Sequence, residues 1–251
     1  MIKRIVSNGC SWMEGMGVTS QDGQGGKLRH RLSALFAKRY SAKDINLSIP
    51  GGSNDRILRT TIDWFTKNKT LNHNETFVLI GLTQPQRTEM YYNETNSYIK
   101  IRASDMEYWK ENFSEDHEDM MKLCNLKFKY AHSHQDDYER LMRMILGMCS
   151  VCEYYGAKYL ITDAYGNIKD WEERGHAYPL LNKGDINKRS SAEFFDGNPN
   201  IYLENSWVDL LGAPSRWNKH YDESDLGHPN TKGNEEWFKH LIKYIKKNNI
   251  I

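Results

Sequence analysis

The sequence predicts an α/β fold with three layers, in which helices cover both faces of a mainly parallel, five-stranded sheet. Short apolar runs alternate with longer segments whose apolar residues recur every three or four positions, and this alternation extends along the chain. The length of 251 residues fits one large α/β domain better than two small ones. The sequence therefore favours a single domain over residues 1–251.

Five apolar runs are the predicted strands, and the run at 76–81 is the clearest of them. Their ranges are 2–6, 44–48, 76–81, 157–162 and 201–203. Four segments have the periodicity of amphipathic helices. Three of them are about 26–40, 138–155 and 231–247. The fourth is capped by Ser53 or Asn54 and carries Ile57, Leu58, Ile62 and Phe65 on one face. Because strands and helices alternate, we expect successive strands to run parallel.

Three stretches lack clear periodicity. The segment from the first strand through Gly26 is polar and rich in glycine, and it is predicted to be a loop. Residues from about 88 to 135 are predicted to be an insertion of short helices over one sheet edge. A separate domain is disfavoured because no linker-like composition brackets this stretch. Residues from about 164 to 200 are predicted to be a long loop.

The charge composition excludes no enzyme class but gives no support to polyanion binding. The chain has 34 basic and 33 acidic residues, so neither nucleic acid nor an anionic membrane is an expected partner. No run of about 18 apolar residues occurs, and none follows Lys3 and Arg4, which argues against a membrane span or a signal peptide. The expected location is the cytoplasm, of a bacterium or of a virus-infected cell.

Neither the cysteines nor the histidines have the spacing of a metal site. Cys149 and Cys152 form a Cys-x-x-Cys pair, but it lies in a helical pattern and no second pair with zinc spacing occurs. The cysteines are therefore interpreted as reduced thiols of the core rather than as a redox or metal pair. His132 and His134 have no further partner at ligand spacing. We expect no metal and no cofactor.

Two segments far apart in the sequence carry the residue types of a nucleophilic site. Asn8, Gly9, Cys10 and Ser11 follow the first predicted strand, which places a serine at the carboxyl edge of a parallel sheet, where open α/β folds bind ligands. Near the other end, Asp225 precedes His228 by three residues and Pro229 fixes the backbone after it. A chain in which the serine comes first and the acid and base come last and close together can form a Ser-His-Asp site.

With these residues in view, the sequence resembles the SGNH (GDSL-type) hydrolases, and four blocks of that family align over nearly the whole chain. The Gly-Asp-Ser block resembles Gly9-Cys10-Ser11, and the second block resembles Gly51-Gly52-Ser53. The third block, Gly-x-Asn-Asp, is matched only in position by Gly81-Leu82-Thr83-Gln84. The last block, Asp-x-x-His, is matched in full by Asp225 and His228. The resemblance also implies a flavodoxin-like strand order of 2-1-3-4-5.

The resemblance assigns expected roles to these residues. Ser11 is the expected nucleophile, His228 the general base and Asp225 the group that orients it. Cys10 is a rival nucleophile in the position of the family aspartate. The backbone N–H groups of Ser11 and Gly51 are the expected oxyanion donors.

The third oxyanion donor of the family is an asparagine side chain, and Thr83 stands in its place. Asn54, Thr83 or Gln84 is expected to supply a substitute donor. Arg87 is expected to contact a polar substrate or, in the favoured interpretation, to form an ion pair with Glu89.

The sequence thus predicts an esterase that removes a small acyl group, with acetyl as the expected group, from a carbohydrate-like or other polar substrate. Two alternatives stay open, an acyltransferase that uses the same three residues and a non-catalytic binding module on the same fold. The expected partner is a small-molecule or glycan ester. Neither the identity of that ester nor an oligomeric state follows from the sequence.

Overall fold

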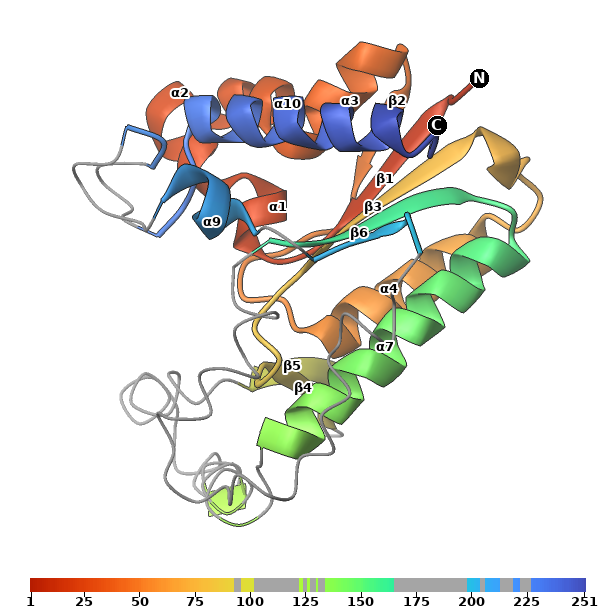
Figure 1. Cartoon of the computed structure of the whole chain (residues 1–251). Coiled ribbons are helices and arrows are strands. Elements are labelled where there is room, and N and C mark those ends of the chain that lie inside the picture. The colour runs from red at the N-terminus through yellow and green to blue at the C-terminus, as the bar shows by residue number, and fades with distance from the viewer. Residues whose placement is uncertain are drawn as a thin grey trace.

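A computed structural model describes residues 1–92, 96–101, 122–123, 126, 130, 134–164, 198–203, 206–212, 219–221 and 227–251. Its centre is a five-stranded parallel sheet with the order β2-β1-β3-β6-β7 (Figure 1). The strands are β1 (Arg4–Asn8), β2 (Lys43–Asn46), β3 (Thr76–Leu82), β6 (Lys158–Asp163) and β7 (Ile201–Tyr202). Counted in chain order, this is the predicted order 2-1-3-4-5, so the predicted fold class is confirmed.

Helices form a layer on each face of the sheet. One layer contains α2 (Met16–His30), α3 (Leu32–Tyr40) and α10 (Thr231–Lys247), and the other contains α4 (Asn54–Lys67) and α7 (His134–Tyr154) (Figure 1). Successive residues of a strand point to opposite faces, so each face has its own hydrophobic core. Ile5 and Phe77 belong to the core under α3 and α10, whereas Val6 and Val78 belong to the core under α4 and α7.

Strand β3 is the centre of the sheet because it pairs with β1 on one side and with β6 on the other. All of its residues are buried. A strand covered on both faces requires a continuous apolar run, which explains why this segment is the clearest strand in the sequence. The prediction at 76–81 is therefore confirmed and extends to Leu82.

The predicted loop before Gly26 is wrong, because most of this segment is helical. A short helix α1 (Ser11–Glu14) is followed by α2, and the helix predicted at 26–40 is interrupted at Arg31, whose backbone is extended. The glycines of α2 lower its helix propensity, so its sequence gives little local signal. Packing of α2 against α3 and α10 stabilises it instead. The Arg31 side chain pairs with Asp44 of β2 at 2.8 Å.

The beginning of the predicted helical insertion is also wrong. Strands β4 (Thr88–Tyr92) and β5 (Ser97–Ile101) form an antiparallel hairpin that packs against α4 (Figure 1). Threonine, tyrosine and isoleucine favour strands, and the cross-strand pair Tyr91–Tyr98 has its ring centroids 5.2 Å apart. Most of the remaining predicted insertion, like the predicted loop at about 164–200, lies outside the described residues.

The burial of individual side chains shows which face of each helix packs against the sheet. Ile145 and Met148 of α7 and Trp237 and Leu241 of α10 are buried, as the amphipathic patterns of these two segments predict. Ile62 of α4 was expected on the inner face but is 39% exposed. Buried Thr61 and Trp64 take the inner positions instead, so the buried stripe of α4 is rotated relative to the predicted one.

Three cysteines are free thiols buried in the protein, and Cys124 lies outside the described residues. Burial raises the pKa of Cys149 and of Cys152 above the ordinary thiol value. Such thiols are poorly reactive, which agrees with a packing role. His132 and the side chain of His134 are likewise not described, and the described residues contain no cluster of three or more metal-ligating side chains.

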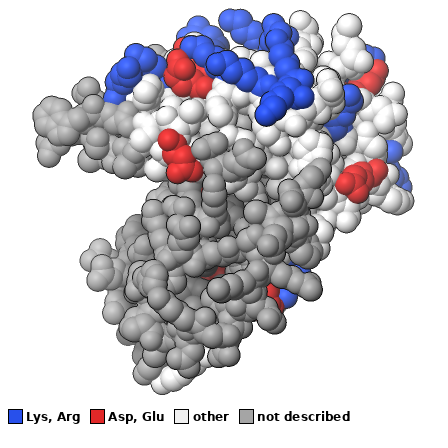
Figure 2. Space-filling view, viewed as in Figure 1, with Lys and Arg blue, Asp and Glu red and all other residues white. Residues whose placement is uncertain are grey.

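Figure 2 shows Lys and Arg side chains gathered over the side of the molecule that carries α10. Lys246 and Lys247 lie in the last turn of α10, where the helix dipole favours positive charge. Among the described helices, none is both long enough and apolar enough to cross a lipid bilayer.

Candidate active site

The segments that follow β1 and β3 meet at the carboxyl edge of the sheet. Asn8 pairs with Ile80 in the sheet register, so Ser11 and Thr83 each lie three residues beyond a paired position. The two strand ends approach closely. A Cβ atom on Gly9 would lie 2.9 Å from the carbonyl oxygen of Gly81, so a larger residue does not fit at position 9 without a shift of its neighbours.

Ser11 is the first residue of α1 and follows an extended Cys10. The serine is 8% exposed, and its hydroxyl group forms no hydrogen bond with the described part of the chain. Cys10 is fully buried in the core under α3 and α10. The turn therefore directs the thiol into the core, which disfavours Cys10 as a nucleophile relative to Ser11.

The loop that contains the second block packs on the loop that contains the first. The backbone N–H of Ile49 donates to the carbonyl oxygen of Gly9 at 3.4 Å, and a Cβ atom on Gly52 would lie 3.0 Å from the same oxygen. Gly51 has a φ of 67°, a left-handed conformation that favours glycine. Within the described chain the N–H group of Gly51 has no hydrogen-bond acceptor.

Ser53 and Asn54 were both candidates for the N-terminal cap of α4, and the structure gives them different roles. The Ser53 hydroxyl caps α4 by accepting from the backbone N–H of Arg56 at 3.2 Å. The Asn54 side chain instead bonds the backbone of Thr83 twice. Its amide donates to the Thr83 carbonyl oxygen at 2.9 Å, and its oxygen accepts from the Thr83 N–H at 3.0 Å. This reciprocal pair, which we call the Asn54–Thr83 clamp, joins the second block to the third.

Arg87 turns back onto the third block. Its Nη1 donates to the Thr83 hydroxyl oxygen at 2.9 Å and its Nε donates to the Gln84 side-chain oxygen at 3.2 Å. The favoured ion pair between Arg87 and Glu89 is wrong. The Glu89 carboxylate accepts two hydrogen bonds from Arg59 of α4, at 2.7 and 2.9 Å, because the β4–β5 hairpin lies against that helix.

The loop of the third block is also fastened to α7. Nη2 of Arg140 donates to the carbonyl oxygen of Pro85 at 2.6 Å and to the carboxylate of Asp137 at 2.9 Å. Asp137 is 2% exposed, so this ion pair is shielded from solvent. The residues between Thr83 and Arg87 are thus held from both α4 and α7.

The segment that carries His228 lies against the beginning of the chain. A Cβ atom on Gly17, near the start of α2, would lie 2.8 Å from the carbonyl oxygen of His228 and 2.6 Å from that of Pro229. The rings of Trp12 and Tyr221 pack edge to face, with their centroids 6.0 Å apart, and Tyr221 forms a β-bridge with Pro229. Residues that follow Ser11 in the chain therefore lie against the segment that carries His228, although no hydrogen bond joins the Ser11 hydroxyl to His228.

Asn230 fixes the end of this segment. Its side-chain oxygen caps α10 by accepting from the Gly233 N–H at 3.0 Å, and its amide donates to the carbonyl oxygens of Lys219 and Tyr221, each at 2.9 Å. Burial raises the pKa of the Tyr221 hydroxyl, which donates to the Gly212 carbonyl oxygen at 2.8 Å. Asp225 lies outside the described residues, so its predicted partnership with His228 stays a prediction.

Sequence reasoning missed two further asparagines that hold the site together. The Asn8 amide donates to Thr60, to Thr61 and to the backbone of Ile57, and thereby ties the end of β1 to α4. The Asn46 amide donates to the carbonyl oxygen of Met13 at 3.0 Å and ties the end of β2 to α1. Each is the last residue of its strand, and a polar residue at that position was the available signal.

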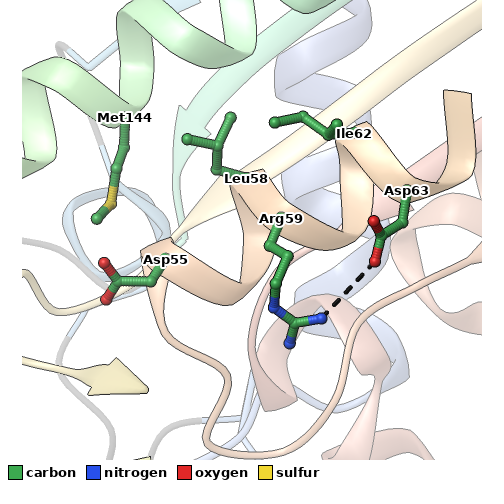
Figure 3. Close-up of a pocket in the computed structure, with 6 residues that line it drawn as sticks. All are labelled: Asp55, Leu58, Arg59, Ile62, Asp63 and Met144. Carbon is green, nitrogen blue, oxygen red and sulfur yellow. Dashed lines mark ion pairs between the residues drawn. The ribbon is translucent and has the colours of Figure 1, made fainter. Parts of the chain in front are cut away.

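A shallow pocket of about 280 Å³ lies elsewhere, on the outer side of α4 (Figure 3). Its lining consists of Asp55, Leu58, Arg59, Ile62 and Asp63 of α4, together with Met144 of α7. Arg59 is already engaged, since it pairs with Asp63 at 3.7 Å and with Glu89, and its guanidinium lies 3.8 Å from the centre of the Tyr98 ring. None of the residues proposed for the Ser11 site lines this pocket, and Arg59 serves to hold the β4–β5 hairpin on α4.

A family model described as a family of unknown function, DUF6071, matches residues 20–250. The chain belongs to this family. The matched range of the DUF6071 model begins after Ser11 and includes His228. Among curated proteins, no sequence matches the chain.

Solved structures similar to this DUF6071 chain include TesA, an esterase and a GDSL-like lipase. A crystal structure of TesA has 12% sequence identity and a TM-score of 0.50, and the alignment covers 98% of this chain and 99% of that one. The psychrotrophic esterase EstA from Pseudoalteromonas sp., inhibited by monoethylphosphonate, has 15% identity, coverages of 98% and 97%, and a TM-score of 0.47. A GDSL-like lipase from Bacteroides thetaiotaomicron VPI-5482 has 15% identity, coverages of 98% and 88%, and a TM-score of 0.44. At 12% identity the likeness to TesA shows a shared fold alone.

Proposed function

We propose that the chain is a serine esterase that removes a short acyl group, acetyl in the first instance, from a carbohydrate-like or other polar alcohol. The observation that carries this proposal is the contact of Gly17 and Trp12 with the segment around His228. This contact brings the neighbours of a serine and of a histidine together at the carboxyl edge of a parallel sheet, which is where such sheets bind ligands.

In the proposed reaction, the Ser11 hydroxyl oxygen attacks the ester carbonyl carbon while His228 accepts the hydroxyl proton. Collapse of the tetrahedral intermediate breaks the bond to the alcohol, and His228 passes the proton to the departing oxygen. Water then attacks the acyl-enzyme in the same way, which releases the carboxylic acid and restores Ser11. Asp225 is the proposed partner that orients the His228 ring. We expect the hydrogen bond between the Ser11 hydroxyl group and His228 to form when substrate is bound, as catalytic hydrogen bonds often do.

The oxyanion of the intermediate requires preorganised donors. We assign this role to the backbone N–H groups of Ser11 and Gly51, neither of which has an acceptor among the described residues. For the third donor, the geometry favours Thr83 over Asn54, because both polar ends of the Asn54 side chain are bonded to the Thr83 backbone. The Gln84 side chain beside Thr83 favours a polar substrate over a long apolar one.

A fluorophosphonate probe tests the proposal, because it reacts covalently with activated serine nucleophiles. We expect intact-protein mass spectrometry to show one adduct on the wild-type protein and peptide mapping to place it on Ser11. Ser11→Ala should abolish the adduct, whereas Cys10→Ala, a matched change at the adjacent buried residue, should retain it. Release of acetate from an acetylated monosaccharide then tests the substrate class. A folded wild-type protein that takes up no probe would favour a binding module and would refute the esterase.

A further inference from the structure

The hydroxyl group of Thr83 is held by one neighbour and has an unused proton. The residue is 1% exposed, and both of its backbone polar groups are taken by the Asn54–Thr83 clamp. Its hydroxyl oxygen accepts from Arg87. A threonine hydroxyl can donate one hydrogen bond as well as accept. Within the described part of the chain, however, the Thr83 hydroxyl proton has no acceptor. Buried donors are rarely left unpaired, so this proton calls for an explanation.

We propose that Arg87 is a positioning residue that holds the Thr83 hydroxyl as the third oxyanion donor. Together the two side chains would replace the asparagine side chain of the SGNH pattern, which is missing here. This inference rests on the proposed esterase function, and it assigns Arg87 a role through Thr83 rather than on the substrate directly.

The position of Thr83 fits this role. Thr83 and Ser11 follow neighbouring parallel strands at matching register positions, so both lie at the same edge of the sheet. The Asn54–Thr83 clamp ties Thr83 to the helix that begins three residues after Gly51, the second proposed amide donor. The three proposed donors are therefore connected through short, hydrogen-bonded segments, as a preorganised oxyanion hole requires.

The geometry of Arg87 explains how it would act. Its guanidinium is fixed by the Gln84 side chain as well as by Thr83, and its backbone N–H donates to the Gln84 carbonyl oxygen at 3.1 Å. With the hydroxyl oxygen occupied by a charged donor, the hydroxyl proton is directed away from Arg87. A hydrogen bond from a cation also polarises the O–H group and makes it a stronger donor.

The test is a double-mutant cycle in kcat, measured with p-nitrophenyl acetate on enzyme whose Ser11 is confirmed to react with the fluorophosphonate. Thr83→Val removes the hydroxyl at nearly constant volume, and we expect kcat to fall about 100-fold while KM changes less than about 2-fold, as for loss of one oxyanion donor. Arg87→Met should lower kcat about 10-fold or more. The double variant should be no slower than Thr83→Val within about 2-fold, because Arg87 acts through the hydroxyl.

Thr83→Ser is the matched control, since it keeps a hydroxyl at the same position and should retain most of the wild-type kcat. The shape of the pH profile should be the same in every variant, because no titrating group is removed. Melting temperatures check folding, and Thr83→Ala replaces Thr83→Val if the valine variant does not fold.

Two outcomes would overturn the inference while leaving the esterase intact. One is an unchanged kcat in Thr83→Val, which removes Thr83 from the oxyanion hole. The other is an additive loss in the double variant, which means that Arg87 contacts the substrate itself. A wild-type protein without Ser11 labelling would instead overturn the proposed function and this inference together.

Discussion

At the scale of single residues, the site is built from glycines that permit close approach and asparagines that join loops. Gly9 and Gly17 lie where a Cβ atom would collide with backbone atoms of other segments. Asn8 and Asn54 each make several buried hydrogen bonds between a strand end and a helix. Buried amides of this kind contribute through geometry, because an unmatched donor or acceptor in the same place costs about 1–3 kcal/mol. The residues around Ser11 therefore depend on contacts that are distant in sequence.

Gly17→Ala tests whether the His228 segment is seated on α2. Alanine in a helix is favoured over glycine by about 1 kcal/mol, so propensity alone predicts a more stable protein. The new Cβ atom would lie 2.6 Å from the Pro229 carbonyl oxygen, and we expect overpacking on the order of 1–3 kcal/mol to displace the segment instead. Urea denaturation should show lower stability, and the fluorophosphonate should react more slowly.

Gly25→Ala is the matched control in the same helix. The nearest atom to its added Cβ is the end of the flexible Arg29 side chain at 3.9 Å, so this variant should be neutral or slightly stabilised and fully reactive. Equal behaviour of the two alanine variants would contradict the contact between α2 and the His228 segment.

At the scale of elements, each structural segment is fastened by a small number of specific side chains. The β4–β5 hairpin is held on α4 by Arg59 and Glu89, and the third-block loop is held on α7 by Arg140. His73 belongs to the 3₁₀ helix η1 (His73–Glu75). Its ring packs edge to face against the rings of Phe65 and Tyr155, with centroid separations of 4.9 and 5.2 Å. Its Nε2 donates to the carbonyl oxygen of Asn68 at 3.0 Å.

The burial of His73 predicts a pH-dependent stability. Desolvation lowers the pKa of His73 below its ordinary value of 6.5, and nearby Arg4 lowers it further, against the opposing effect of the Asn68 hydrogen bond. The unfolded chain then binds the proton more tightly than the folded one, so the full stability is present above pH 6.5 and is lost as the pH falls below it. The melting temperature should therefore fall from pH 7.5 to 5.5.

His73→Phe should reduce this dependence, because phenylalanine fits among the same rings and carries no proton. Burial also lowers the pKa of His220 and of His240, so part of the pH dependence should persist in the variant. A variant whose melting temperature falls as steeply with acid as that of the wild type would contradict the assignment to His73.

At the scale of the whole molecule, local and non-local signals account for what the sequence predicts. The continuous apolar run of β3 and the amphipathic patterns of α7 and α10 are local, and all three elements appear where predicted. Helix α2 is stabilised by its neighbours against its own glycine content, so no local pattern indicated it. The β4–β5 hairpin was missed because it lies in the stretch from about 88 to 135, whose sequence lacks clear periodicity.

The same difference between local and non-local signals explains which parts of the candidate site were predicted. Ser11 and His228 were found from short motifs, and the strand order that brings their segments to one edge was implied by the SGNH resemblance. The Asn54–Thr83 clamp and the contact of Arg87 with Thr83 link residues whose partners a linear motif does not specify. The wrong prediction for Glu89 has the same origin, because its partner Arg59 lies on a different element.

The central claim is that His228 activates Ser11 at the carboxyl edge of the sheet. A crystal structure of the fluorophosphonate adduct tests it most directly, through the distance between the Ser11 Oγ atom and the nearest His228 ring nitrogen. We predict phosphorus bonded to Ser11 and a ring nitrogen within about 2.6–3.2 Å of Oγ or of the adduct oxygen that replaces the leaving group. A His228 ring about 10 Å or more away, roughly the width of a helix, would contradict the claim.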